Sequence, residues 1–122
     1  LERIRGFFED VHAHHQELRA QCGRVVGCPL VNLAQEMSTQ DPVLRERLGE
    51  VFDRQVERLE RVIAEAVGRG DLPNQDTRRS ACSLIALLEG GILLAKTQDD
   101  PETLAGLGDD ALRMLGAASA GP

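Results

Sequence analysis

The sequence has no tryptophan and no tyrosine, and aromatic residues make up only 2% of its 122 residues. β-Sandwiches and barrels draw on aromatic and β-branched side chains, so this shortage favours aliphatic packing between helices. Positive charge is also scarce, because 14 Lys and Arg stand against 20 Asp and Glu, for a net charge of -6. Binding to phosphate backbones needs clustered cations, so the composition argues against nucleic acid as a direct partner of this chain.

Cysteines and long apolar runs are few as well. The three cysteines, Cys22, Cys28 and Cys82, include no Cys-x-x-Cys pair. This odd number favours free thiols in a reducing cytoplasm over a disulfide framework. No uninterrupted apolar run reaches the roughly 18 residues that span a membrane. The chain starts at Leu1 in helical rhythm without an initiator Met, so we expect a fragment whose N-terminal part is missing.

What the sequence does have is helical periodicity along its length. Pro29 suits a first helical turn, and Asp41 followed by Pro42 is a strong helix start. Strand alternation and internal repeats are absent from the sequence, so we expect a single all-α domain over residues 1–122. Apolar residues recur at three- and four-residue spacing in five segments, which are about 1–20, 28–37, 42–67, 76–97 and 101–115.

The segment SLIALLEGGILLA, Ser83–Ala95, is apolar at every position except Ser83 and Glu89. A helix that is apolar all round must be buried all round. At about 100° per residue, the side chains of this helix fall on two faces. One face is bulky, and the other mixes leucine with small residues. The bulky face comprises Ala81, Leu84, Ile85, Leu88, Ile92 and Ala95, and the second face comprises Ser83, Ala86, Leu87, Gly90, Leu93, Leu94 and Thr97.

A five-helix chain can cover the bulky face from within but has few partners left for the second face. The simplest cover is a second copy of the chain in a two-fold contact. We expect the last helix to join this contact through Leu107, Ala111 and Met114. Two helices from each subunit then form a four-helix bundle in a homodimer. The alternative is a monomeric bundle in which residues 83–95 are entirely internal.

Three stretches, taken together, resemble the C-terminal domain of tetracycline-repressor (TetR) family transcriptional regulators. They are GCPLVNLAQEMSTQDPVLRERL (Gly27–Leu48), the GRGDLP loop (Gly68–Pro73) and LEGGILLAK (Leu88–Lys96). The resemblance runs in order from Leu1 to about Leu115. It implies a cytoplasmic bacterial domain that binds a small-molecule effector and holds a dimer together. The family's DNA-binding helix-turn-helix domain would precede this region, and a small apolar ligand would release the repressor from DNA.

The resemblance also implies an effector pocket among the first four helices. Asn32 and Glu89 are polar exceptions within apolar helices, and we expect each to pair with the other or with an arginine. The candidate pocket walls can equally be ordinary core residues. These candidates are Phe8, Val11, His15, Leu33, Met37, Phe52, Leu59, Leu84 and Leu88.

Catalysis has little support in the sequence. The carboxylates of residues 42–67 alternate with arginines as on a solvated face, and no phosphate loop or Ser/His/Asp grouping is present. We therefore expect no enzyme and no cofactor. His12 and His15 lie three residues apart, and thiolates from Cys22 or Cys28 would be needed to complete a metal site. A metal- or thiol-responsive helical dimer is one alternative function, and a purely structural dimerisation module is another.

Overall fold

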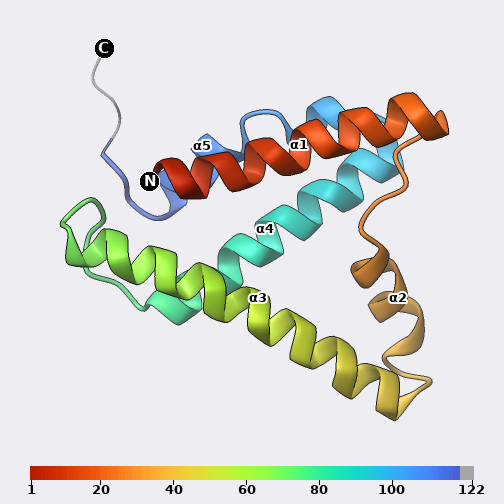
Figure 1. Cartoon of the computed structure of the whole chain (residues 1–122), viewed down its shortest axis with the longest axis horizontal. Helices are drawn as coiled ribbons and strands as arrows, with labels where there is room; N and C mark the ends of the chain where they lie inside the picture. The colour runs from red at the N-terminus through yellow and green to blue at the C-terminus, as the bar shows by residue number, and fades with distance from the viewer. Residues whose placement is uncertain (119–122) are drawn as a thin grey trace.

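A computed structural model describes residues 1–118, and this range contains helices and no strands (Figure 1). The expected all-α class with five helices is confirmed. Residues 119–122 of the domain expected over 1–122 lie outside the described residues. The elements are α1 (Glu2–Cys22), α2 (Pro29–Met37), α3 (Pro42–Gly68), α4 (Thr77–Gln98), the 3₁₀ turn η1 (Pro101–Leu104) and α5 (Leu107–Met114).

Local hydrogen bonds fix several helix ends where the sequence indicates them. The Asp41 carboxylate accepts hydrogen bonds from the backbone N–H groups of Val43 and Leu44, each at 3.0 Å, and so caps α3. Asp76 caps α4 in the same way, by accepting from the N–H of Arg79 at 2.9 Å. These two caps satisfy N–H groups that have no partner within their own helices.

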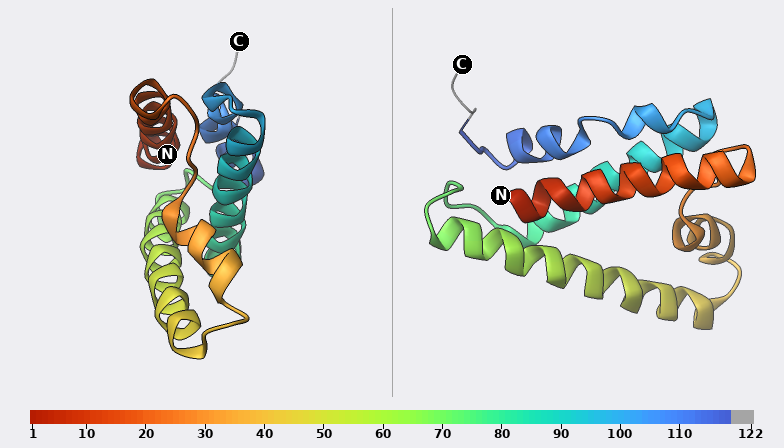
Figure 2. Two further views of the ribbon diagram at one scale, coloured as in Figure 1. Left: turned by 90° about the vertical axis from the view of Figure 1, so that its right-hand side faces the viewer. Right: turned by 45° about the horizontal axis from the view of Figure 1, so that its top comes forward.

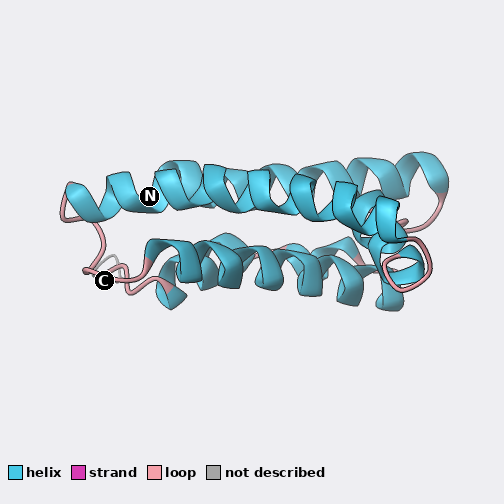
Figure 3. Ribbon diagram, turned by 90° about the horizontal axis from the view of Figure 1, so that it is seen from below, coloured by secondary structure: helices cyan, strands magenta, loops and turns pink. Residues whose placement is uncertain are grey.

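The helices form two layers, which Figure 2 shows edge-on and Figure 3 shows from below. One layer holds α1 and α3, and the other holds α4, η1 and α5 (Figure 2). Helix α3 packs against α4, while α1 packs against α5 and η1. Side chains that meet between the layers form one aliphatic core, in which Ile4, Ile63, Ala81, Ala95 and Ala111 have no exposed surface.

The two faces of α4 have different surroundings. On the bulky face, Leu84 is 1% exposed and Ala95 is 0% exposed. On the second face, Leu93 is 44% exposed and Leu94 is 53% exposed. The chain therefore covers one face of α4 and leaves much of the other uncovered, as the helical wheel predicts.

Helix α4 is also long and apolar enough to cross a membrane by length and composition. The sequence has no uninterrupted apolar run of this length, because α4 includes a few polar residues. Its average hydropathy is nevertheless high enough to pass the test. Only 33% of the 18-residue apolar stretch of this helix is buried inside the fold. A helix at the centre of a protein core passes the same test, and packing of its bulky face against the other layer is the behaviour of such a helix.

The last helical segment is broken, although one helix over about residues 101–115 is predicted. Gly106 has a left-handed φ of 79° and separates η1 from α5. The break brings Leu104 and Leu107 together over Gly91 of α4. A Cβ at Gly91 would lie 3.3 Å from Leu104 Cδ2 and 2.5 Å from Leu107 Cδ1. Gly91 therefore provides the space in which this part of the second layer packs.

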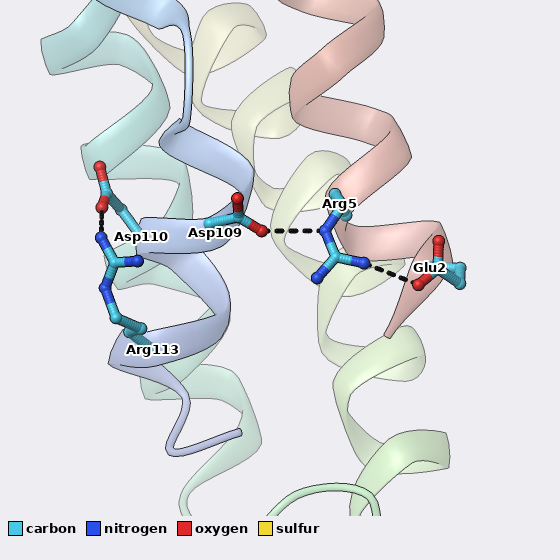
Figure 4. A network of polar contacts seen from close by, with 5 residues as sticks. All are labelled: Glu2, Arg5, Asp109, Asp110 and Arg113. Atoms are coloured by element: carbon cyan, nitrogen blue, oxygen red, sulfur yellow. Dashed lines mark hydrogen bonds and ion pairs between the residues drawn. The ribbon is translucent and has the colours of Figure 1, made fainter. Parts of the chain in front are cut away.

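Polar contacts connect the start of α1 to α5 (Figure 4). Arg5 Nε donates to Asp109 Oδ1 at 2.9 Å, and Arg5 Nη1 donates to Glu2 Oε1 at 2.7 Å. Gly108 allows the two helices to approach closely, because a Cβ there would lie 3.1 Å from the carbonyl oxygen of Arg5. A further ion pair joins Asp110 and Arg113 within α5 (Figure 4). Helix α5 is thereby fixed beside α1.

Candidate functional site

The nine expected pocket residues are distributed between the core, the surface and two separate cavities. Phe8, Leu84 and Leu88 belong to the core and are at most 5% exposed. Leu33 is 39% exposed. Those with intermediate burial are Val11, Met37 and Phe52. His15 is 5% exposed and Leu59 is 9% exposed.

The first cavity is a cleft of about 410 Å³ between α1 and α3, which we call the α1–α3 cleft. Of the expected pocket residues, Leu59 lines it. Arg3 and Arg58 give this cleft a cationic character. The Nη1 atom of Arg3 forms an ion pair with Glu65 Oε2 at 3.0 Å. The lining residues are Arg3, Ile4, Phe7, Gln55, Arg58, Leu59, Val62 and Ile85.

The second cavity is a groove of about 490 Å³ where α2 lies across α3 and α4, which we call the α2–α3–α4 groove. Of the expected pocket residues, Phe52 lines it. Its wall is apolar apart from Gln35 and Glu89, and Glu89 is the single ionisable carboxyl group in it. The lining residues are Val31, Ala34 and Gln35 from α2, Phe52 and Val56 from α3, and Cys82, Ile85, Ala86 and Glu89 from α4.

Glu89 is only partly satisfied in this groove. Its Oε2 atom is buried and has no hydrogen-bond partner within residues 1–118. Desolvation by burial raises the pKa of Glu89 above its ordinary value of 4.5, while a hydrogen bond from the Cys28 thiol opposes this shift. The carboxyl group therefore retains an unused acceptor beside an apolar cavity.

The expected pairing of Asn32 with Glu89 is not formed. Asn32 Nδ2 donates to the carbonyl oxygen of Val26 at 3.1 Å, and Lys96 Nζ donates to Asn32 Oδ1 at 3.2 Å. The amide thus connects the joint before α2 to the end of α4. No arginine forms an ion pair with Glu89 among the residues that the structure describes.

The histidines of α1 have separate partners. His12 Nε2 lies 3.3 Å from Glu102 Oε1. His15 Nδ1 lies 2.8 Å from the carbonyl oxygen of Val11, so this nitrogen carries the proton and donates it, and the buried Nε2 has no partner within the described range. Residues 1–118 contain no group of three or more His, Cys, Asp or Glu side chains that could hold a metal ion.

The expected dimer residues form an exposed strip on α4 and α5, with one exception. Ala86, Gly90, Leu93, Leu94 and Thr97 are exposed on α4. Met114 on α5 is also exposed, at 57%. Ser83, Leu87 and Leu107 have intermediate burial at its edges. Ala111 is 0% exposed and packs inside its own chain, because α5 turns this position toward the core. We call the exposed and half-buried residues of this set the α4–α5 strip.

The hydroxyl groups of the strip bond to their own helix. Ser83 Oγ donates to the carbonyl oxygen of Arg79 at 3.0 Å, and Thr97 Oγ1 donates to that of Leu93 at 2.8 Å. Both donors are satisfied without a partner outside α4. The strip therefore offers an apolar surface with small residues and no unmet hydroxyl donor, which suits close contact with another helix.

Most of the groove residues are absent from the sequence-based set. Cys82, Ile85, Ala86 and Glu89 follow the i, i+3, i+4, i+7 spacing of a single helix face. This third face of α4 lies between the bulky face and the strip, and its spacing can be recognised in the sequence. Which helix covers it depends on how α2 docks, and periodicity does not contain that information.

Comparisons with known proteins point to one family. Residues 1–108 match the family model described as "Tetracyclin repressor-like, C-terminal domain". A TetR-family transcriptional regulator from Cytophaga hutchinsonii has a similar solved structure, with 25% identity and a TM-score of 0.68. A TetR transcriptional regulator from Chloroflexus aurantiacus J-10-FL is 27% identical, with a TM-score of 0.66. The matches cover 80% and 89% of this chain, but only 50% and 57% of those two chains. No curated protein matches the chain.

The half-buried carboxyl group of Glu89 predicts a pH-dependent stability difference for Glu89→Gln. Because folding raises the pKa of Glu89, its contribution to stability is present below pH 4.5 and is lost as pH rises through the folded-state pKa. Glutamine does not incur this loss. At pH 7 the variant should be more stable by up to about 1 kcal/mol, with allowance for solvent screening of a half-exposed group. Urea unfolding at pH 4 and pH 7 measures it, with Glu36→Gln as the control; a difference independent of pH would contradict the assignment.

Proposed function

This chain belongs to the tetracycline-repressor-like C-terminal domain family, and we propose that it senses a small molecule and joins two copies of a bacterial repressor. The observation that carries the proposal is that different faces of α4 contribute to the core, to the groove and to the strip. One helix thereby contacts the cavity and the surface at which a second subunit would bind. The proposal includes no catalytic activity and no resident cofactor, and it places the protein in the cytoplasm.

The dimer is proposed from the α4–α5 strip. Leucine side chains that are 44% and 53% exposed share a face of α4 with Ala86 and Gly90, and so form an apolar surface along this helix. Exposed apolar patches of this kind mark contact sites on soluble proteins. A two-fold contact would pair the strip with itself and form a four-helix bundle from α4 and α5 of each subunit.

Regulation is proposed to occur by a shift between dimer geometries. Ala86 belongs to both the groove and the strip, so a ligand in the groove touches the helix that holds the interface. A DNA-binding half would precede this domain in the intact regulator, and the two copies would have to match the spacing of adjacent major grooves. An effector that binds one geometry more tightly would shift the population away from DNA.

The dimer is tested with Leu94→Glu. Two-fold symmetry places the new charge in the interface twice, so the dissociation constant of the dimer should rise at least about a hundredfold. Because Leu94 is 53% exposed in the single chain, the helical content should be unchanged. Sedimentation equilibrium measures both proteins, and Leu33→Glu on α2 is the matched control. A Leu94→Glu protein that remains as dimeric as the control would refute the interface.

The sensing role is tested by a thermal-shift screen of small apolar compounds. A compound at 100 times its dissociation constant stabilises the folded state by about 2.7 kcal/mol and raises the melting temperature. Ala34→Trp should fill the groove and remove this effect, whereas Ala64→Trp on the exposed side of α3 should not. A screen in which no compound stabilises the chain would favour a structural dimerisation module.

A further inference from the structure

The α2–α3–α4 groove contains an anionic acceptor in an otherwise apolar wall, and we infer that it binds an organic cation. The ligand class is an apolar body with an ammonium group that donates a hydrogen bond to Glu89. This inference rests on the proposed sensing function and specifies which molecules the sensor takes.

The size and lining of the groove fit a small apolar body. Its volume of about 490 Å³ lies within the range of roughly 300–1,000 Å³ for small-molecule sites. Phe52 and Val56 from α3 and Val31 and Ala34 from α2 supply much of its apolar lining. Such a lining supplies affinity through apolar burial, and leaves the choice among ligands to the few polar groups.

Glu89 is the polar group that makes this choice. Its Oε2 atom is buried without a partner among residues 1–118, and the Cys28 thiol donates one hydrogen bond to the carboxylate. A buried acceptor that lacks a donor is unfavourable, and rotation of the Glu89 carboxyl group toward the groove that it lines would let a ligand N–H group satisfy it. An ammonium group also brings the opposite charge, and the low polarity of the groove strengthens the attraction.

No cation of the described chain takes this place. Lys96 lies two helical turns beyond Glu89 on the same face of α4, about 10 Å along the helix. Its Nζ atom donates instead to Asn32 Oδ1 at 3.2 Å. Glu89 is therefore the one charged side chain that lines the groove, and the net charge of -6 favours cations further.

The α1–α3 cleft provides an internal contrast. It is similar in volume, at about 410 Å³, but its charged lining residues are Arg3 and Arg58. Arg3 is paired with Glu65, so Arg58 supplies the remaining positive charge, which disfavours a cation and favours an anion there. We therefore predict opposite charge preferences for ligands of the two cavities. The methyl NMR signals of Val31 in the groove and Val62 in the cleft tell where a compound binds.

Three compounds with one apolar body test the inference: 4-phenylbutan-1-amine, 4-phenylbutan-1-ol and 4-phenylbutanoate. At pH 7 they carry a positive, a neutral and a negative head group. Calorimetric titration of the full 122-residue chain gives affinities, and methyl NMR spectra give the location. We expect the amine to bind at least about tenfold more tightly than the alcohol and to shift the signals of Val31 and Val56. The carboxylate should bind the groove most weakly.

Variants assign the preference to one carboxyl group. Glu89→Gln should lower the affinity of the amine to that of the alcohol, whereas Glu36→Gln removes the same charge from the exposed side of α2 and should change it less than twofold. Phe52→Ala should weaken all three compounds alike, because it removes apolar contact only.

Several outcomes would overturn the inference. Equal affinities of the three compounds in the unaltered chain would refute the cation preference without need of any variant, and would leave a groove that still binds ligands. Amine-induced shifts at Val62 rather than Val31, or no amine binding at millimolar concentration, would also refute it. The sensing function is judged separately by the compound screen, so the two failures are distinguishable.

Discussion

The apolar character of α4 on nearly all sides is the constraint on which the rest of the structure depends. Leu84, Leu88 and Ile92 are at most 5% exposed, and full burial of such side chains stabilises a fold by roughly 1.5–3 kcal/mol each. The surface ion pairs contribute much less, since exposed pairs are worth about 0–1 kcal/mol. Both layers are therefore organised around α4, with α3 along one flank and η1 and α5 along the other. The strip stays exposed because no helix of the described residues packs over it.

The adjacent glycines of α4 serve its two environments separately. Gly91 is buried under Leu104 and Leu107, where a Cβ would collide with Leu107. Gly90 is exposed, and a Cβ there would meet nothing within 4 Å of its own chain. One glycine thus permits packing within the subunit, and the other leaves the strip flat enough for a neighbouring helix. The groove lies between these two surfaces, so a ligand in it would act on the same helix that both surfaces share.

Much of the fold follows from the sequence, because its determinants are local. Asp41 caps α3 as predicted, α4 begins within a residue of its expected start at about 76, and α3 ends at Gly68, one residue beyond the expected Val67. The break at Gly106 was not predicted, since it depends on how leucines pack over Gly91 in another helix. The groove was largely missed for a similar reason. Phe52 was identified, but the contributions of Val31, Gln35 and Cys82 depend on the docking of α2, and the free oxygen of Glu89 depends on where Asn32 finds its partners.

The most direct test of the account is the accessibility of the strip in solution. A dissolved gadolinium chelate enhances the relaxation of methyl groups that solvent can approach, and it requires no change to the chain. Leu93 and Leu94 are 44% and 53% exposed in the single subunit, and Val43 on α3 is 69% exposed. If a twin subunit covers α4, the methyl groups of Leu93 and Leu94 should be protected while those of Val43 are strongly enhanced. Enhancement of Leu94 equal to that of Val43 would show that water covers this face, and would contradict the account.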